Sequence, residues 1–141
     1  MFAARMTRRY KRLATAMVLP LALACSDSES TGPKTNALVG TWQVTSLEAM
    51  GIDMIQLGMS MKLTFTAGNT YTIVIKDDIF DYCDTGTSCT ESGSYAVTAT
   101  QVRMDPGTED EVTFNYSVQG ATLTFTTDVE GTRLTMILNR S

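Results

Sequence analysis

Hydrophobic and polar positions alternate along most of the chain after residue 37, with a period of two residues. Residues 61–66, 71–76 and 112–118 each carry an apolar side chain at every second position. This alternation is typical of β-strands with one buried and one solvent-facing side. Sequences that favour turns, such as Asp105-Pro106-Gly107 and Glu130-Gly131, separate these stretches. The pattern therefore predicts antiparallel strands joined by short connections.

We predict eight strands and no helix longer than two turns. The approximate strand ranges are 38–47, 61–66, 71–76, 94–98, 101–104, 112–118, 123–125 and 134–138. The phase of the alternation changes near Ala99-Thr100, which predicts a tight turn or a bulge there. Strands at this spacing form a meander that closes either as a barrel or as a two-sheet sandwich.

The segment from residue 48 to residue 60 breaks the alternation but remains apolar. One interpretation is that it caps the core, because packing explains most apolar residues. The other is a lid over a cavity mouth, because methionine side chains repack easily around different ligands. The candidate lid residues are Met50, Met54, Ile55, Leu57 and Met59.

The first predicted strand carries the chain's single tryptophan. Gly40 and Trp42 share one face of it, and Arg140 lies in phase with the apolar positions of the last strand. A charge at an inward position needs a partner such as an aromatic ring. A core tryptophan on an ordinary β-strand is the simpler interpretation, and it stays open at this point.

The Gly40-x-Trp42 pattern, with Arg140 in phase, resembles the lipocalin-type barrels and most closely the bacterial lipocalin-like domain lipoproteins. The resemblance covers residues 37–141. It implies an all-β fold, an antiparallel up-and-down barrel of about eight strands. It also implies that Trp42 closes one end of the barrel beside Gly40 and that Arg140 lies across the indole.

Residues 1–24 have the features of a secretory signal. Basic side chains precede a run of 12 apolar residues, 13–24, which is too short to span a bilayer. The sequence Ala22-Leu23-Ala24-Cys25 resembles the lipobox of bacterial lipoproteins, although Ala22 stands where leucine is usual. The resemblance implies that Cys25 is lipidated. The alternative is ordinary cleavage after Ala24, which would leave an unmodified Cys25.

Residues 25–36 would then be a lipidated cysteine followed by a polar linker without apolar side chains. Such a linker is expected to be disordered and to reach about 35 Å when extended. Serine at position 26, directly after the cysteine, resembles the residue pattern of lipoproteins that are sorted to the outer membrane. We therefore expect a lipid-anchored protein of the cell envelope, in the outer membrane and facing the periplasm or the cell surface.

Lipidation of Cys25 leaves Cys83 and Cys89, which flank a turn sequence and can pair as a disulfide. A ring this small contributes about 2 kcal/mol in the chain-entropy treatment. The surrounding stretch is acidic, and carboxylates of this kind are ligands that Ca²⁺ uses in proteins. The spacing is not that of an EF-hand loop, and acidic loops are usually solvated. We therefore expect neither a metal nor a cofactor.

Charge and composition narrow the range of functions. After residue 24 the chain has 6 basic and 15 acidic side chains, a net charge of −9, which disfavours nucleic acid as a partner. It has no histidine, the commonest general base, and no motif of a nucleophilic or phosphate-binding site. The sequence therefore predicts a protein that is not an enzyme. We also expect a monomer.

The resulting hypothesis is a lipoprotein whose barrel holds a small hydrophobic ligand. The expected lining residues are inward-facing, namely Phe65, Tyr71, Ile73, Tyr95, Phe114, Tyr116, Phe125 and Met136. The alternative is a protein-binding module of the envelope, such as an inhibitor of a cationic hydrolase or an assembly component. The acidic loop residues Asp77, Asp78, Asp81 and Asp84 would then steer a basic partner.

Overall fold

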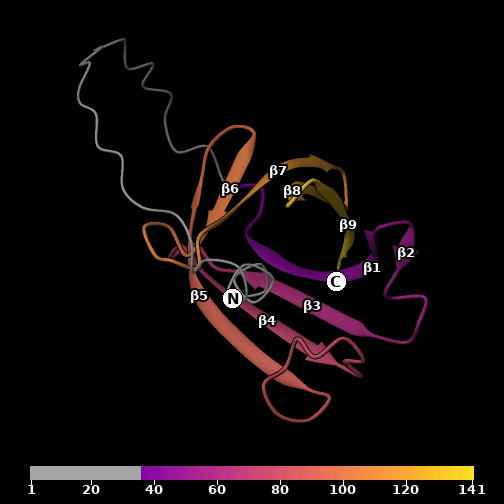
Figure 1. Ribbon diagram of the computed structural model, residues 1–141. Helices are drawn as coiled ribbons and strands as arrows, with labels where there is room; N and C mark the ends of the chain where they lie inside the picture. The colour runs from indigo at the N-terminus through magenta and orange to yellow at the C-terminus, as the bar shows by residue number, and fades with distance from the viewer. Residues whose placement is uncertain (1–35) are drawn as a thin grey trace, which may run out of the picture.

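The computed structural model describes residues 36–141, which form one antiparallel sheet closed into a barrel (Figure 1). The strands are β1 (Gly40–Ala49), β2 (Ile52–Asp53), β3 (Ser60–Phe65), β4 (Thr70–Lys76), β5 (Cys89–Val97), β6 (Gln101–Met104), β7 (Val112–Gln119), β8 (Thr122–Val129) and β9 (Thr132–Arg140). The signal sequence, Cys25 and nearly all of the linker lie outside the described residues.

Strand order confirms the predicted up-and-down barrel. Apart from β2, every strand pairs with its neighbours in sequence, and β1 also pairs with β9. This last pairing closes the sheet and distinguishes a barrel from a two-sheet sandwich. β2 is an additional strand of two residues beside the end of β1. Within residues 36–141 no helix is long and apolar enough to cross a bilayer.

The alternating sequence pattern determines which side of each strand is buried. In β3 and β4 the apolar positions are buried, and the intervening Thr and Lys positions are exposed or half-buried. These two strands pair directly, so that Leu63 lies opposite Ile73 and Phe65 opposite Tyr71. The inward side chains of all strands meet in one hydrophobic core.

β1 starts and ends two residues later than predicted and contains an unexpected bulge. Its register against β9 shifts between Val44 and Ser46. The extra residue changes the phase, so Trp42 and Val44 are buried before the bulge and Leu47 and Ala49 after it. The bulge bends the strand, and β1 can therefore pair with β3 near its start and with β2 near its end.

Trp42 and Arg140 close the end of the barrel where β1 begins. The indole is fully buried and donates its Nε1–H to the carbonyl oxygen of Leu38 at 2.8 Å. The guanidinium carbon of Arg140 lies 4.2 Å from the centroid of the Trp42 ring. Arg140 also donates hydrogen bonds to the carbonyl oxygens of Val39 and Ala37, at 3.0 and 3.2 Å. The charge therefore lies against an aromatic face and is hydrogen-bonded to the backbone.

Gly40 allows this arrangement for two reasons. Its φ of +136° is strained for any residue with a side chain, and a Cβ atom there would lie 2.6 Å from Nη1 of Arg140. We expect Gly40→Ala to lower the free energy of unfolding by about 2–4 kcal/mol, measured by urea denaturation. Gly107→Ala is the matched control, since Gly107 has a φ of +80° but open space around it, and it should cost only about 1 kcal/mol. Equal losses in the two variants would contradict a steric role for Arg140.

Candidate functional site

The residues expected to line a ligand cavity pack mainly against one another. The ring centroids of Phe65 and Tyr95 are 5.1 Å apart, those of Phe114 and Phe125 are 5.5 Å apart, and those of Phe65 and Phe125 are 6.1 Å apart. Tyr116 is half-buried, whereas the other seven are buried: Phe65, Tyr71, Ile73, Tyr95, Phe114, Phe125 and Met136. All eight side chains belong to the hydrophobic core or pack against it.

The hydroxyl groups of the inward tyrosines already have partners. Tyr95 donates to the carbonyl oxygen of Thr66, and Tyr116 to that of Thr98, at 2.8 and 2.9 Å. Tyr71 donates to a carboxylate oxygen of Asp105 at 2.5 Å. Burial, together with this carboxylate, raises the pKa of Tyr71 far above its ordinary value. These hydroxyl groups stabilise the barrel, and ligand orientation would require them to exchange partners.

A pocket of about 470 Å³ lies at the opposite end of the barrel from Trp42. Nine described residues line it: Ala49, Met50, Ile52, Met54, Phe80, Val129, Glu130, Thr132 and Leu134. The lining residue Ala49 lies seven residues after Trp42 on β1, which is about 23 Å of fully extended strand, and pairs with Leu134 on β9. None of the eight predicted lining residues belongs to this set, whereas the candidate lid residues Met50 and Met54 do. We call this site the mouth pocket.

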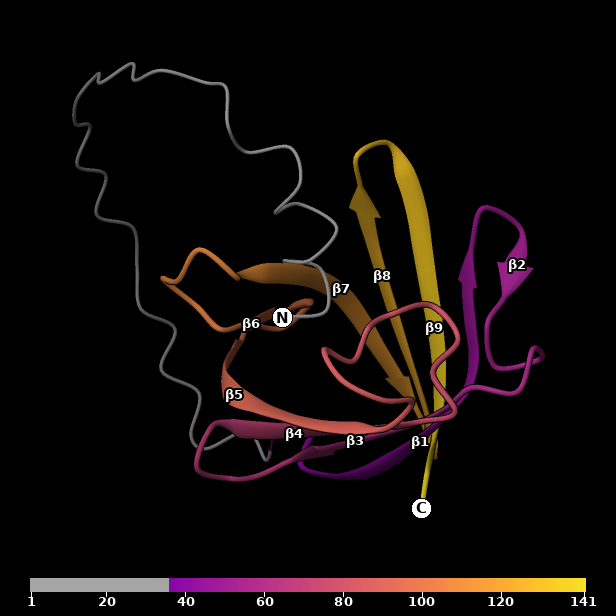
Figure 2. The ribbon, with the colours of Figure 1, turned by 60° about the horizontal axis from the view of Figure 1, so that its bottom comes forward.

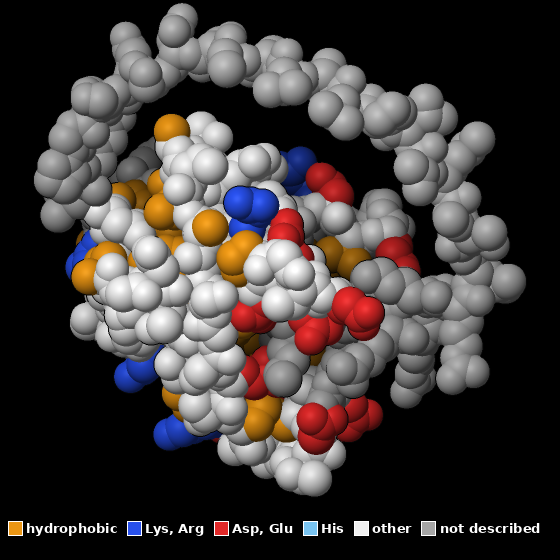
Figure 3. All heavy atoms as spheres, turned by 90° about the vertical axis from the view of Figure 1, so that its left-hand side faces the viewer, with side chains coloured by type: hydrophobic (Ala, Val, Ile, Leu, Met, Phe, Trp, Pro, Cys, Tyr) orange, Lys and Arg blue, Asp and Glu red, His pale blue; other side chains and the backbone are white. Residues whose placement is uncertain are grey.

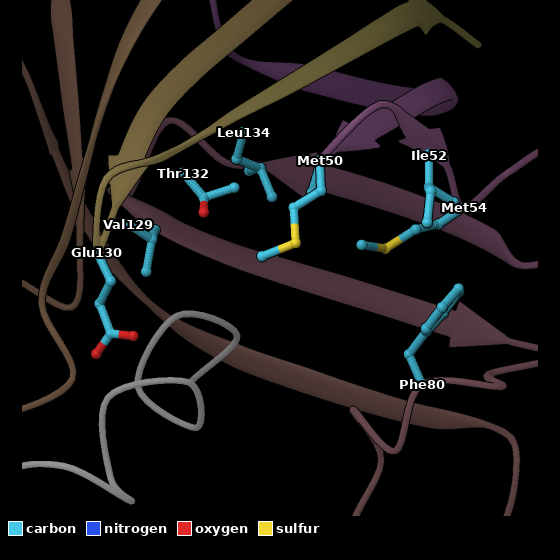
Figure 4. A pocket seen from close by; sticks show the side chains of 9 residues that line it. Met50, Ile52, Met54, Phe80, Val129, Glu130, Thr132 and Leu134 are labelled. Atoms are coloured by element: carbon cyan, nitrogen blue, oxygen red, sulfur yellow. The ribbon is translucent and has the colours of Figure 1, made fainter.

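Three segments far apart in sequence form the walls of the mouth pocket. They are the β1–β2 hairpin, the β8–β9 hairpin and the 77–88 loop between β4 and β5, which carries Phe80 (Figures 2 and 4). In the close-up, Glu130 lies at one edge of the pocket and Phe80 at the opposite edge, with Met50 between them. Leu134, Met54 and Ala49 are buried and form its inner surface.

Much of the outer wall is apolar and exposed. Met50 is 78% exposed, Ile52 51% and Phe80 36%, and Ile79 beside Phe80 is 60% exposed. A contiguous group of exposed apolar side chains is a candidate interaction site. Of the other candidate lid residues, Met59 is buried, Ile55 is half-buried and Leu57 is exposed. The 48–60 segment therefore caps the core with some side chains and presents others at the mouth.

The 77–88 loop is held in place by polar groups that the sequence suggested for other roles. Asp78 is buried, and its carboxylate accepts the backbone N–H groups of Phe80 and Cys83 at 2.9 and 2.7 Å. Cys83 and Cys89 are joined by a disulfide. Tyr82 donates its hydroxyl hydrogen to Sδ of Met54 at 3.1 Å, and burial, with the charge of Asp78, raises the pKa of Tyr82 to about 12. The loop is therefore attached to the pocket lining.

The 77–88 loop beside the pocket carries several acidic side chains, but they are not arranged to bind a metal ion together. Asp77, Asp81 and Asp84 are exposed, whereas the Asp78 carboxylate is used within the loop. Among the described residues, no group of three or more His, Cys, Asp or Glu side chains is arranged to hold a metal ion. Figure 3 shows a group of Asp and Glu side chains on the side of the barrel where β5 and β6 lie.

Comparison with known families identifies the class of protein. Residues 38–137 match the lipocalin-like domain family. The chain therefore belongs to the lipocalin-like domain family, which confirms the resemblance seen in the sequence. Comparison with the curated proteins found no match.

Three solved structures are similar to this chain. The lipoprotein YedD from Klebsiella pneumoniae subsp. pneumoniae MGH 78578 has 13% identity and a TM-score of 0.46, with 79% of this chain and 78% of that chain covered. Fatty-acid-binding protein 1 of Echinococcus granulosus has 15% identity and a TM-score of 0.44, with coverage of 74% and 97%. A point mutant of the fluorescent protein UnaG has 13% identity and a TM-score of 0.42, with coverage of 73% and 95%. Each of these likenesses is too distant to bear on function.

Asp53 fixes the β1–β2 hairpin that forms one wall of the mouth pocket. Its Oδ1 accepts the backbone N–H groups of Leu47 and Ile55 at 3.1 and 3.0 Å. Burial alone would raise the pKa of Asp53, but these donors outweigh it and hold the pKa below its ordinary value of 3.8. The carboxylate therefore stabilises the folded hairpin fully above pH 3.8, and this stabilisation is lost as the pH falls through the lowered pKa.

We expect the Leu47 and Ile55 amides to lose hydrogen-exchange protection as the pH falls below about 4, because protonation of Asp53 weakens both hydrogen bonds. NMR-detected exchange, corrected for the intrinsic rate at each pH, measures this. Asp53→Asn should lower the protection at neutral pH and abolish its acid dependence, whereas Asp128→Asn should change neither. Unchanged protection of these two amides in Asp53→Asn would contradict the assignment.

Proposed function

We propose that this protein is a non-enzymatic binding protein that holds a small apolar molecule in the mouth pocket. The observation that supports the proposal is the mouth pocket itself, with its exposed wall of Met50, Ile52 and Phe80 and its buried inner surface. A volume of about 470 Å³ lies within the range of small-molecule sites, roughly 300–1,000 Å³. The site is open, so a ligand enters without a change in the barrel.

The strength of binding follows from the apolar area that the pocket covers. A ligand that buries about eight methylene groups gains roughly 6 kcal/mol before the entropic costs of association. This corresponds to affinities weaker than nanomolar. Met50 and Met54 provide flexible side chains that adapt to differently shaped apolar groups. We therefore expect the mouth pocket to bind small apolar molecules of different shapes with moderate affinity.

The site differs from the one expected from the inward-facing pattern. Phe65 and Phe125 belong to the hydrophobic core, with ring centroids 6.1 Å apart, and a ligand placed between them would have to separate them. Entry at the mouth requires no such rearrangement. The proposed ligand therefore lies beside the β1–β2 and β8–β9 hairpins and leaves the aromatic core intact.

The protein is further proposed to be a lipoprotein of the cell envelope. Residues 1–24 would be the signal sequence, Cys25 the lipidated residue and residues 26–36 the linker, all but the last of these residues outside the described part. An extended linker of about 35 Å would keep the barrel, residues 37–141, within reach of the membrane surface. Outer-membrane residence, facing the periplasm or the cell surface, rests on Ser26.

The alternative of a module that binds a basic protein has weaker support. Its predicted contact set included Asp78, whose carboxylate is buried and accepts two backbone N–H groups. A basic partner could therefore reach Asp77 and Asp81 but not Asp78 without unfolding the loop. The net charge of −9 after residue 24 remains its main support.

Ile52→Ser should weaken saturable binding of the neutral dye Nile red about fivefold, because it removes apolar surface from the pocket wall. Fluorescence titration of the dye measures this. Trp42 lies at the other end of the barrel, so its own emission should change little. Ile137→Ser is the matched control, since Ile137 is 37% exposed on β9 and is not among the lining residues.

A loss of affinity confined to Ile52→Ser would support the mouth pocket as the site. No saturable binding by the unmodified protein would refute the proposed function. Equal losses in Ile52→Ser and Ile137→Ser would show that the dye binds elsewhere.

A further inference from the structure

The two hairpin turns at the mouth pocket share an unusual backbone conformation. The β1–β2 turn has Met50 at φ 54° and Gly51 at φ 77°, and the β8–β9 turn has Glu130 at φ 51° and Gly131 at φ 81°. Two-residue connections with both φ angles positive are type I′ turns, whose first position strongly favours Asn, Asp or Gly. Here that first position holds methionine in one turn and glutamate in the other.

This choice sets Met50 and Glu130 apart from the rest of the described chain. The other residues with side chains and positive φ in residues 36–141 are Asn69, Asp77, Asp81 and Asp105, all of types that tolerate this conformation. The β7–β8 turn, at the closed end of the barrel, is of a different type, because only its first residue, Gly120, has a positive φ, of 60°. Both residues that depart from the preference line the mouth pocket.

Packing within the protein does not explain the departure. Met50 is 78% exposed, and Glu130 is also exposed, so neither side chain gains much from burial in the unliganded barrel. Asn at either position would relieve the backbone. Residues that break a local rule without a local benefit are characteristic of functional sites. These two residues are therefore candidates for contact with the ligand.

The chemistry of the two side chains indicates what that ligand carries. Among the nine described lining residues, Glu130 is the only ionisable one, and none is Lys or Arg. Thr132 is the other polar residue, two positions along the same hairpin. The remaining surface, from Met50 across to Phe80, is apolar (Figure 4). A carboxylate ligand would face the like charge of Glu130 with no compensating cation, whereas a cationic group would form an ion pair.

We infer that the mouth pocket takes a cationic amphiphile, with its chain along Met50, Ile52 and Phe80 and its positively charged group at Glu130. The inference rests on the proposed function and specifies the ligand class for the same site. Glu130 acts as the determinant of charge preference, and Met50 as an apolar contact. The site thereby discriminates against fatty acids, whose carboxylate has the opposite charge.

The test compares three probes with the same twelve-carbon chain: dodecyltrimethylammonium and dodecanoate below their micelle concentrations, and dodecanol below its solubility limit. Calorimetric titration of the unmodified protein should rank the cation first and dodecanoate last. Glu130→Gln should weaken binding of the cation and strengthen binding of dodecanoate, each about two- to fivefold, and leave dodecanol unchanged. Added salt should reduce the preference of the unmodified protein.

Asp128→Asn is the matched control, because it removes the same charge from the same hairpin at a residue outside the lining set. It should keep the order of the three probes. Glu130→Asn should lose the cation preference as Glu130→Gln does, but also raise the midpoint of thermal unfolding by about 2–8 °C, because asparagine suits the turn. Glu130→Gln should not raise the midpoint.

Equal affinity for the cation and dodecanoate, or an equal effect of Asp128→Asn and Glu130→Gln, would overturn the inference and leave the proposed function standing. A Glu130→Asn variant that is no more stable than Glu130→Gln would also overturn it, because the turn would then carry no strain. If none of the three probes binds, the proposed function fails and the inference fails with it.

Discussion

The antiparallel pairing of β1 with β9 is the constraint on which the rest of the barrel depends. It joins the two ends of the described chain, with Trp42 opposite Arg140 and Ala49 opposite Leu134. Closing a loop of about 100 residues costs roughly 4 kcal/mol of chain entropy in a simple polymer treatment. The buried side of both strands and the stacking of Arg140 on the indole offset this cost. The same pairing positions the closed end and the two hairpins of the mouth pocket.

Most of the fold could be predicted from the sequence because alternation and burial have the same cause. Strands β3 and β4, with clean alternation, were predicted nearly to the residue. β5 starts at Cys89, whereas the predicted strand began at Ser94. The prediction missed residues 90–93 because they include no apolar side chain, although they pair with β4 through their backbone. The bulge in β1 could not be predicted, because the residue types at Thr45 and Ser46 are equally compatible with a continuous strand. Such features depend on the pairing partner, which a single stretch does not reveal.

The mouth pocket was largely missed, for a different physical reason. Alternation shows which side chains face inward, but whether they leave a space depends on packing at the scale of single methyl groups. Phe80 stands in an acidic loop without periodicity, and its position depends on Asp78 and the Cys83–Cys89 disulfide. One signal was present, since Glu130-Gly131 was recognised as a turn. Its first residue, unsuited to that turn type, could have drawn attention to the site.

The two ends of the barrel make opposite use of backbone strain. At the closed end the positive-φ positions include Gly40, Gly120 and Asn69, which are residue types that tolerate this conformation, and Arg140 occupies the space beside Gly40. At the mouth, each side chain in the left-handed region costs about 1–2 kcal/mol. Two such costs are a substantial part of a total stability of roughly 5–15 kcal/mol. Neither Met50 nor Glu130 offsets its cost by burial in the unliganded protein. The closure of β1 on β9 holds both hairpins despite this strain. Under the proposed function, contact with a bound molecule is where these side chains would contribute free energy.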